Sequence, residues 1–480
     1  MTLPVSTITL AGVDIGTTHT KAAVYRPDGT CLASRRAATA GDADALRATA
    51  LRLLAECVAE TGTPPVAVGV ASMAETGVPL DAHGEPDGPL LDWRDGSAAY
   101  EADELARAVG AESFFSLTGL RPGAKLPLAR WMRLRRHAPD VLRDMARWAS
   151  VADLVAASLT GVLATSPTLA SRTGAYDIRR GAYRADLLDL AGLSPDRLPP
   201  VVAGVAGRVG TAAAGRTGLL SGTPVVVAGH DHMAAAWAAG VRAPGRVADS
   251  MGTAEAIVTP VAAVPARVVA GATVGPFVDG ASYCLISGLP ASGGLVGWLL
   301  GRFAPAGHPD PHRWFTELVG PPEAPPTGIT VLPYLRGRAT PEPDPRRTLS
   351  VHGLRPSHTL ADLGRAVLEG LSMQARWMLD TASGGVRPGA VTVFGGPAAN
   401  PTWMWIKARL TPAPLAVVPG AHGAALGAAQ LAGRAIGVPD TSVPAPPQAP
   451  VPAPEWEEAY RSRFLPLATA PSPSDEEETQ

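Results

Sequence analysis

The sequence of 480 residues contains few cysteines and no long uninterrupted apolar run. Its three cysteines, Cys31, Cys57 and Cys284, are far apart and match no metal-binding spacing, which fits a reducing cytosol. No stretch of about 18 apolar residues occurs, which argues against a membrane span. The first ten residues lack the basic and apolar regions of a signal peptide. We therefore expect a cytoplasmic protein with no membrane partner.

The chain also lacks an excess of charge of either sign. Lys and Arg number 41, and Asp and Glu number 43, which leaves a net charge of −2. Proteins that bind the nucleic-acid backbone need a basic face, so we expect no nucleic-acid partner. A hydrophobic content of 46% and a charged content of 18% support a large core and exclude global disorder. The length predicts two domains, because single cores rarely exceed about 250 to 300 residues.

Strand and helix patterns alternate in the first half of the chain. Residues 10–15 are apolar, Gly16-Thr17-Thr18 follows, and 21–25 alternates before another short strand at 31–34, which predicts a β-meander. Apolar periodicity distinguishes the later helices from buried strands. It predicts helices over 43–60, 100–109, 126–136, 151–159 and 233–240, and strands over 66–71 and 223–228.

A weak internal repeat relates the two halves of the chain. Residues 13–17, Val-Asp-Ile-Gly-Thr, are echoed by 249–253, Asp-Ser-Met-Gly-Thr, and an apolar run follows each copy. The repeat predicts duplicated domains that face a cleft, although five similar residues also arise by chance. We place a first domain at 1–242, a second at 243–440, and a Pro-rich linker with an acidic tail at 441–480.

The second half continues with helical and strand signals. An apolar stripe predicts a long helix over 360–381, and 391–394 reads as a strand. Asn400 fits the cap of a helix that begins at Pro401. Small residues predict a closely packed helix over 421–435, and a short helix over 455–465 would place Trp456, Tyr460 and Phe464 on one face.

The hairpin that contains Asp14 and Lys21 is the first candidate site. Its turn exposes backbone N–H groups and the hydroxyls of Thr17 and Thr18, which suit phosphate oxygens. Asp14 at the strand end could hold Mg²⁺ through water, and Lys21 could reach a phosphate as a point charge. The alternative is an ordinary hairpin in which Asp14 caps its own turn.

The second copy of the repeat offers a similar turn at Gly252 and Thr253. Ser250 stands where the first copy has Asp14. This difference is expected if the first turn binds the metal and the second turn binds only phosphate. The alternative is that Gly-Thr is merely a common turn dipeptide.

The residues His230-Asp231-His232 follow a predicted buried strand and precede a helix. Near a helix N-terminus the dipole would keep Asp231 ionised, and the carboxylate could accept the proton of a substrate hydroxyl during phosphoryl transfer. A metal site is an alternative, although consecutive side chains are expected to point in different directions. A plain helix cap is another.

Weaker signals mark places for a sugar and for a purine. Glu75 follows a predicted buried strand, where it would face a crevice, and Trp93 could stack on a sugar. The alternatives are a solvated Glu and a core Trp. Gly395-Gly396 lets the chain pass close to a flat ligand, and Asn400 offers an amide to a purine edge. The alternative is a plain strand–helix loop.

Taken together, these segments resemble the FGGY family of carbohydrate kinases, over about residues 8 to 437. The resemblance implies an α/β fold of two actin-like (ribonuclease H-like) domains that flank a catalytic cleft, and it implies ATP and Mg²⁺ as cofactors. The segments that carry it, in order, are AGVDIGTTHTKAAVY at 11–25, SMAETGVPLD at 72–81, LTG at 159–161, GHDHMAAAWAAG at 229–240, DSMGTAEA at 249–256, AVLEGLSMQARWMLD at 366–380, FGGPAANPTWMWIKA at 394–408 and ALGAAQLAG at 425–433.

The family resemblance also implies roles for single residues. Asp231 looks like the catalytic base, and Asp14 looks like the acidic residue of the Mg²⁺ site. Glu75 and Trp93 fall where related kinases contact the sugar. The phosphate groups would meet Thr17, Thr18, Lys21, Gly252 and Thr253, and adenosine would meet Gly395, Gly396 and Asn400.

Three departures from the family pattern stand beside these matches. Ser97 replaces the Arg of a common Trp-x-Asp-x-Arg motif, His422 stands where an acidic residue is common, and the spacing after Lys125 is unusual. None removes a phosphoryl-transfer group.

The sugar and the exact class of protein stay open at this point. The resemblance favours an L-fuculose-like ketose first and a D-xylulose-like ketose among the others, and a homodimer is possible. Two other classes compete with a kinase. One is a non-catalytic actin-fold protein that binds sugar or nucleotide and regulates another process. The other is a metal-dependent hydrolase built on residues 230–232.

Overall fold

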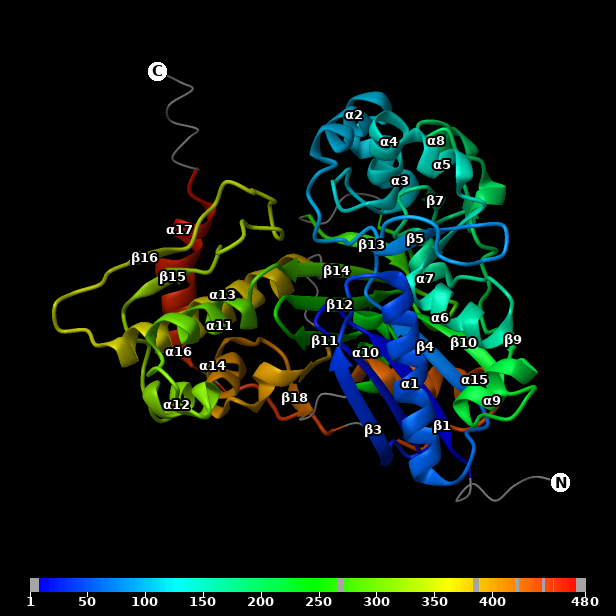
Figure 1. Cartoon of the computed structure of the whole chain (residues 1–480). Coiled ribbons are helices and arrows are strands. Elements are labelled where there is room, and N and C mark those ends of the chain that lie inside the picture. Colours follow the sequence, from blue (N-terminus) through cyan, green and yellow to red (C-terminus); the bar gives the residue numbers. More distant parts are fainter. Residues whose placement is uncertain are drawn as a thin grey trace.

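The computed structural model describes residues 8–471 apart from 266–270, 383–387, 419–422, 443–444 and 452. Two six-stranded sheets form its centre, one in each half of the chain, and helices surround both (Figure 1). This is the expected mixed α/β fold. His422 and the acidic chain end lie outside the described residues. Among the described helices, none is both long and apolar enough to cross a membrane.

The first sheet has the strand order β3-β2-β1-β4-β10-β9. The first three strands form the predicted antiparallel meander, and β1, β4 and β10 run parallel to one another. Every residue of β1 and β4 is buried, as expected for central strands covered on both faces. The strands are β1 Leu10–Ile15, β2 His19–Tyr25, β3 Cys31–Ala38, β4 Val68–Ser72, β9 Val205–Arg208 and β10 Pro224–His230.

The second sheet repeats this plan with the order β13-β14-β12-β11-β17-β18. Its β11–β12 hairpin matches β1–β2, and β11, β17 and β18 are parallel. The five-residue sequence repeat therefore marks equivalent hairpins in two similar sheets. The strands are β11 Arg246–Met251, β12 Glu255–Val261, β13 Thr273–Pro276, β14 Tyr283–Leu289, β17 Ala390–Phe394 and β18 Leu415–Val418.

Helices of the first half pack on its sheet and form a cap above it. In α1, Ala43–Thr61, the side chains of Leu46, Leu53 and Leu54 recur on one face and enter the core. The cap, drawn at the top of Figure 1, has its own apolar core around Phe114 and Trp131. Its elements and the remaining ones of this half are β5 Gly77–Leu80, α2 Ala99–Val109, α3 Ala111–Thr118, α4 Pro127–His137, α5 Pro139–Asp144, β6 Arg147–Ser150, α6 Val151–Thr160, α7 Pro167–Ser171, β7 Tyr176–Asp177, β8 Ala182–Tyr183, α8 Ala185–Asp189, a 3₁₀ turn at Pro195–Arg197 and α9 Thr211–Thr217.

The helices predicted from periodicity are present, and all except the one expected over 455–465 lie within two residues of their expected ends. Asn400 caps α14 as expected, because its Oδ1 accepts the N–H of Trp403 at 2.9 Å. The elements around the second sheet are α11 Gly293–Phe303, α12 Pro311–Leu318, β15 Thr330–Leu332, β16 Ser350–His352, α13 Leu360–Ala382, a 3₁₀ turn at Gly396–Ala399 and α14 Pro401–Leu410.

The end of the chain differs from the expected linker and tail. Residues 454–469 form α16 Pro454–Glu458, a π-helical turn at Ala459–Phe464, and α17 Leu465–Thr469. Trp456, Tyr460 and Phe464 are at most 1% exposed and join the core of the second half. The apolar face predicted for this segment therefore anchors it to the second half, because burying three aromatic rings outweighs the cost of ordering a short helix.

Two helices of small residues lie between the sheets. They are α10, Asp231–Ala238, and α15, Gly423–Ala435. Although α15 comes late in the sequence, it packs on the first sheet. A Cβ atom at Gly12 would lie 1.8 Å from the carbonyl oxygen of Ala425, and one at Gly69 would lie 1.9 Å from that of Ala428. Only glycine permits this approach of helix and strand backbones.

Candidate active site

The carboxyl ends of three parallel strands bring the predicted catalytic residues to one edge of the first sheet. Asp14 lies near the end of β1, Glu75 follows β4 by three residues, and Asp231 follows β10 at the first position of α10. In open α/β sheets this edge is where ligands bind. The sheet thus gathers residues that are more than 200 positions apart in the sequence.

Asp14 is buried and faces Lys21 across the hairpin. The two residues are direct partners in the β1–β2 register, and Lys21 Nζ lies 3.7 Å from Asp14 Oδ2. Asp14 Oδ1 has no hydrogen-bond partner among the described residues. Burial raises the pKa of Asp14 to about 7, against the opposing effect of Lys21 and with a further increase from Asp231. A buried, unsatisfied carboxylate oxygen of this kind suits a divalent cation.

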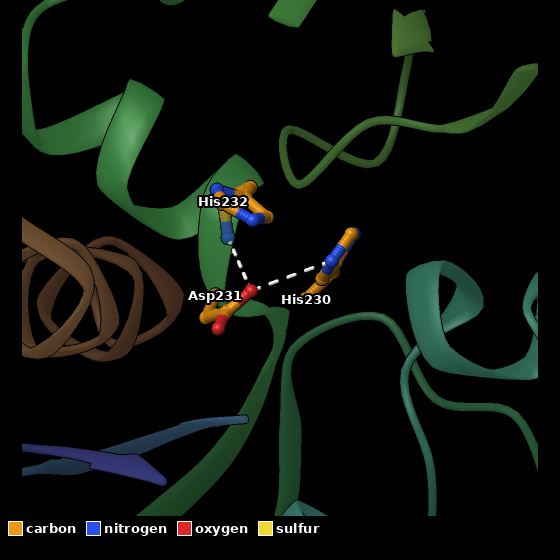
Figure 2. Close-up of side chains that lie close together, drawn as sticks. All are labelled: His230, Asp231 and His232. Carbon is orange, nitrogen blue, oxygen red and sulfur yellow. Dashed lines mark hydrogen bonds and ion pairs between the residues drawn. The ribbon is translucent and has the colours of Figure 1, made fainter. Parts of the chain in front are cut away.

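Asp231 is held by the residues on either side of it (Figure 2). Its Oδ1 accepts the backbone N–H of His232 at 2.7 Å, and His230 Nε2 lies 3.3 Å from the same oxygen. Burial raises the pKa of Asp231 even though His232 acts to lower it. The expected helix-dipole effect is therefore outweighed by desolvation. Burial also holds the pKa of His230 well below its ordinary value, so this imidazole is neutral.

The three consecutive side chains lie closer together than expected. One ligand atom from each of His230, Asp231 and His232 lies within 4.8 Å of the others, so these side chains approach one another although they come from consecutive residues. His232 is also tied to the other half of the chain, since its Nδ1 lies 3.0 Å from Ser250 Oγ in β11. The residue that matches Asp14 in the repeat thus contacts the neighbour of Asp231.

Glu75 is a strained, buried carboxylate. Its backbone has φ +59°, a conformation that non-glycine residues adopt at an energetic cost and that clusters at functional sites. Arg172 donates two N–H groups to Oε1, one of them at 2.9 Å, and Lys125 Nζ lies 3.2 Å from the same atom. Burial alone would raise the pKa of Glu75, but Arg172 and Lys125 hold it well below its ordinary value. The solvated-Glu alternative is wrong.

The sequence did not identify Arg172 or Lys125 as partners of Glu75. Arg172 lies just after α7, 97 residues from Glu75, and no local pattern marks it. Its Nη1 also donates to Thr273 Oγ1 in β13 at 3.0 Å, which joins the Glu75 site to the second sheet. The unusual spacing near Lys125 still delivers its ammonium group to Glu75.

Trp93 connects the sugar-side residues to the first hairpin. Its backbone N–H donates to Thr76 Oγ1 at 3.1 Å, and its indole Nε1 donates to Thr17 Oγ1 at 2.9 Å. Thr18 is exposed at the same turn. Ser97, at the missing Arg position, donates to Asp95 Oδ2 at 2.8 Å within its own loop. The structure therefore brings Trp93 and Thr17 together, and Ser97 has a local role.

The second turn and the glycine pair meet at the far side of the site. The carbonyl oxygens of Gly252 and Thr253 accept N–H groups from Gly293 and Gly294 at the start of α11. Gly395 has φ +111°, and a Cβ there would lie 1.9 Å from the carbonyl oxygen of Met251. Glycine is required at this position because β11 and the loop after β17 pass so closely.

The amide of Asn400 is already engaged by the protein at both ends. Oδ1 caps α14, and Nδ2 donates to Thr316 Oγ1 in α12 at 3.2 Å. Of the two N–H groups on Nδ2, one has a partner among the described residues. Gly396, beside it, has open space where a Cβ would be.

Comparisons with known proteins give the same class. The family models of the N-terminal and C-terminal domains of FGGY carbohydrate kinases match residues 9–238 and 248–436. The xylulose kinase of Streptomyces rubiginosus is 30% identical over 446 residues, 89% of this chain and 88% of that protein. The apulose kinase of Pectobacterium atrosepticum is 26% identical over 89% of this chain and 90% of its own length.

A solved structure extends the likeness to the whole fold. The crystal structure of xylulose kinase from Rhodospirillum rubrum has a TM-score of 0.84 at 28% identity, and the match covers 96% of this chain and 98% of that one. Fold and site together define a carbohydrate kinase with two actin-like domains. The chain belongs to the FGGY family, in its xylulokinase-like branch.

Proposed function

We propose that this kinase transfers the γ-phosphate of ATP to a hydroxyl of a short-chain ketose and that Asp231 is the base. The observation that carries the proposal is the placement of Asp231 beside Asp14 at one sheet edge, where the charge of Asp231 helps to raise the pKa of Asp14. Relatives named xylulose kinase make D-xylulose the first substrate to test. L-Fuculose, favoured by the sequence motifs alone, is the second.

Asp231 has the geometry of a proton acceptor. Among the described residues, hydrogen bonds reach its carboxylate only at Oδ1, which leaves Oδ2 for the substrate hydroxyl. As the hydroxyl oxygen bonds to the γ-phosphorus, the bond from that phosphorus to the bridging oxygen breaks, ADP leaves, and the hydroxyl proton passes to Asp231. The raised pKa makes this carboxylate a better acceptor than an ordinary Asp. The short links to His230 and His232 fix its orientation.

Asp14 is the residue that fits Mg²⁺. Among the residues that the structure describes, none hydrogen-bonds its buried Oδ1, and Mg²⁺ prefers carboxylate and water oxygens. When bound, the ion would supply positive charge to the phosphates. Lys21, close to Asp14, would add charge on the same side.

The remaining predicted residues form the proposed substrate contacts. Glu75 and Trp93 would bind sugar hydroxyls and the sugar face. Thr17, Thr18, Gly252 and Thr253 would bind phosphate groups. Gly395, Gly396 and the amide of Asn400 would contact adenosine, in a cleft that closes over both substrates.

The test is release of ADP with Mg·ATP and single sugars, including D-xylulose, L-fuculose, other ketoses, polyols and sugar acids. We expect release that depends on one ketose and that stops in Asp231→Asn. No release of ADP with any sugar of the panel, together with ATP binding in calorimetry, would favour the non-catalytic class of protein. Activity without ATP that needs a transition metal would point to the hydrolase and to residues 230–232.

Three further proposals concern the whole molecule. We propose that it acts in the cytoplasm and forms a homodimer, which native mass spectrometry would detect. We also propose the division at 1–242 and 243–440, with the qualification that α15 packs on the first sheet and that 454–469 packs on the second half.

A further inference from the structure

Lys407 is a buried cation outside the catalytic residues described above. It lies in α14, and its side chain is 2% exposed. Its Nζ donates to Asp249 Oδ2 in β11 and to Glu255 Oε1 in β12, the latter at 2.6 Å. Both carboxylates are buried as well. An ammonium group is retained in such a place only when partners offset its desolvation.

The network continues from Glu255 to the second hairpin turn. Glu255 Oε2 accepts the hydroxyl of Ser292 at 2.5 Å. The backbone N–H of Ser292 donates to Thr253 O at 2.9 Å, and that of Gly293 donates to Gly252 O at 3.0 Å. A continuous path of hydrogen bonds thus joins α14 to the carbonyl oxygens of the turn.

The direction of these carbonyl groups sets the direction of the N–H groups. In a trans peptide the C=O and the following N–H point to opposite sides. The carbonyl groups of Gly252 and Thr253 are turned toward α11, so the N–H groups of Thr253 and Ala254 are turned away from it. Donors aimed in this way are what a phosphate requires.

The charged residues of the network do not face the catalytic carboxylates themselves. Side chains alternate along a strand, and Ser250, between Asp249 and Met251, points to His232 of the first half. Asp249 therefore points to the opposite face, toward α14. Burial and Glu255 raise the pKa of Asp249 to about 8, against the effect of Lys407. Asp249 thus lies on the face of β11 opposite to the one that contacts His232.

We propose that Lys407, with Asp249 and Glu255, is a positioning residue that aims the Gly252–Thr253 turn and thereby sets the affinity for the nucleotide phosphates. The inference rests on the proposed function, because it takes ATP as the ligand of that turn. The same helix α14 is capped by Asn400 on the proposed adenosine side. Lys407 consequently links the two ends of the nucleotide site.

The experiment compares Lys407→Met and Glu255→Gln with the wild type. ADP affinity is measured by calorimetry, and KM is measured separately for Mg·ATP and for the sugar. We expect ADP affinity to fall by about tenfold or more in Lys407→Met, with the KM for Mg·ATP rising in parallel and the KM for the sugar changing by less than about twofold. Glu255→Gln keeps one carbonyl oxygen to accept from Lys407 and puts an amide NH2 where Ser292 now donates, so a smaller loss of the same kind is expected.

A matched control separates positioning from general damage. Arg365 is another buried cation of the second half, in α13, and its Nε lies 3.7 Å from Glu369 Oε1. Arg365→Met should lower the Tm without selective loss of ADP affinity. Unchanged ADP affinity in folded Lys407→Met and Glu255→Gln would overturn the proposal, as would equal losses in Arg365→Met.

Calorimetry distinguishes a failure of the proposed function from a failure of the positioning role of Lys407. If the wild type binds ADP but phosphorylates no sugar, the proposed function fails while the variants still test the network. If Lys407→Met does not fold, Glu255→Gln decides by itself. A wild type that binds no ADP would overturn both.

Discussion

The two hairpins of the repeat have the same backbone plan and opposite distributions of charge. In the β1–β2 hairpin, Asp14 and Lys21 face each other beside the catalytic edge. In the β11–β12 hairpin, Ser250 occupies the matching position, and the charges lie one residue earlier, at Asp249. Because neighbouring side chains of a strand point to opposite faces, this shift moves the charge from the cleft to the interior.

The difference shows how duplicated elements divide a task. In the proposed function, the first hairpin presents the carboxylate of Asp14 to Mg²⁺ and phosphate. In the second hairpin, the carboxylates of Asp249 and Glu255 point to the interior and pair with Lys407. Only backbone groups and Thr253 then face the proposed phosphate site. Four predictions test how far this division holds, from the largest expected effect to the smallest.

The largest effect is expected from Asp231→Asn, which leaves both hairpins intact. An amide cannot accept the hydroxyl proton, so kcat should fall by about 10² to 10⁴ while ADP affinity is retained. In the wild type, activity should decline as the pH falls through the raised pKa of Asp231, because the protonated carboxyl is not a base. Steady-state kinetics over a pH series measure both. A near-normal kcat in Asp231→Asn would remove this residue from the mechanism.

Asp14→Ser gives the first hairpin the residue of the second. We expect turnover to fall by roughly 10² and more Mg²⁺ to be needed for half-maximal rate, because the cation loses a charged ligand. The reciprocal Ser250→Asp should not restore activity in the Asp14→Ser background. Unchanged Mg²⁺ dependence in Asp14→Ser, measured by titration at fixed ATP, would contradict the assignment of the metal to the first hairpin.

The pH dependence of stability distinguishes the two buried aspartates. Each pKa is raised on folding, from 3.8 to about 7 in Asp14 and to about 8 in Asp249. The folded state then binds more protons than the unfolded state, so each group removes stability as the pH rises from about 4 to its folded pKa. Asp14→Asn and Asp249→Asn should each flatten the decline of Tm with pH. Between pH 7 and 8, Asp249→Asn should flatten the decline of Tm more than Asp14→Asn does. Equal slopes of Tm against pH in the two variants would argue against a higher folded-state pKa for Asp249.

The smallest effect is expected from Gly16→Ala and Gly252→Ala. A Cβ would lie 3.2 Å from His19 O in the first turn and 3.3 Å from Ala254 O in the second, so small shifts accommodate it. Unfolding free energies from denaturant titration should change by less than about 1 kcal/mol. A larger loss in one turn alone would show that the hairpins are not equivalent as backbone structures.

Local pattern predicted several of the long helices and the central strands of this molecule, but not strands such as β9, β13 and β14. Period-2 and period-3.6 apolar spacing placed β1, β2, α1, α6 and α13 within two residues, whereas β3 runs four residues past its expected end. The repeat and the family resemblance brought Asp14, Glu75 and Asp231 to one site. These features depend on neighbours along the chain or on motifs that keep their order.

Long-range partners were the part that sequence could not supply. Arg172 reaches Glu75 over 97 residues, and Lys407 reaches Asp249 over 158. No periodicity encodes such pairs, because they are set by how sheets and helices pack. The same reason explains why desolvation of Asp231 was underestimated and why the packing of 454–469 on the second half was missed.

The position of α15 makes the order of the chain part of its architecture. A fragment that stops after α10 would leave the backbone surface of Gly12 and Gly69 open, because the helix that fills it is made about 190 residues later. During synthesis the packing of the first sheet can therefore be completed only after nearly the whole chain has been made. For the same reason, two separately expressed halves should regain the native fold only by associating. The second half would then supply α15 to the first sheet.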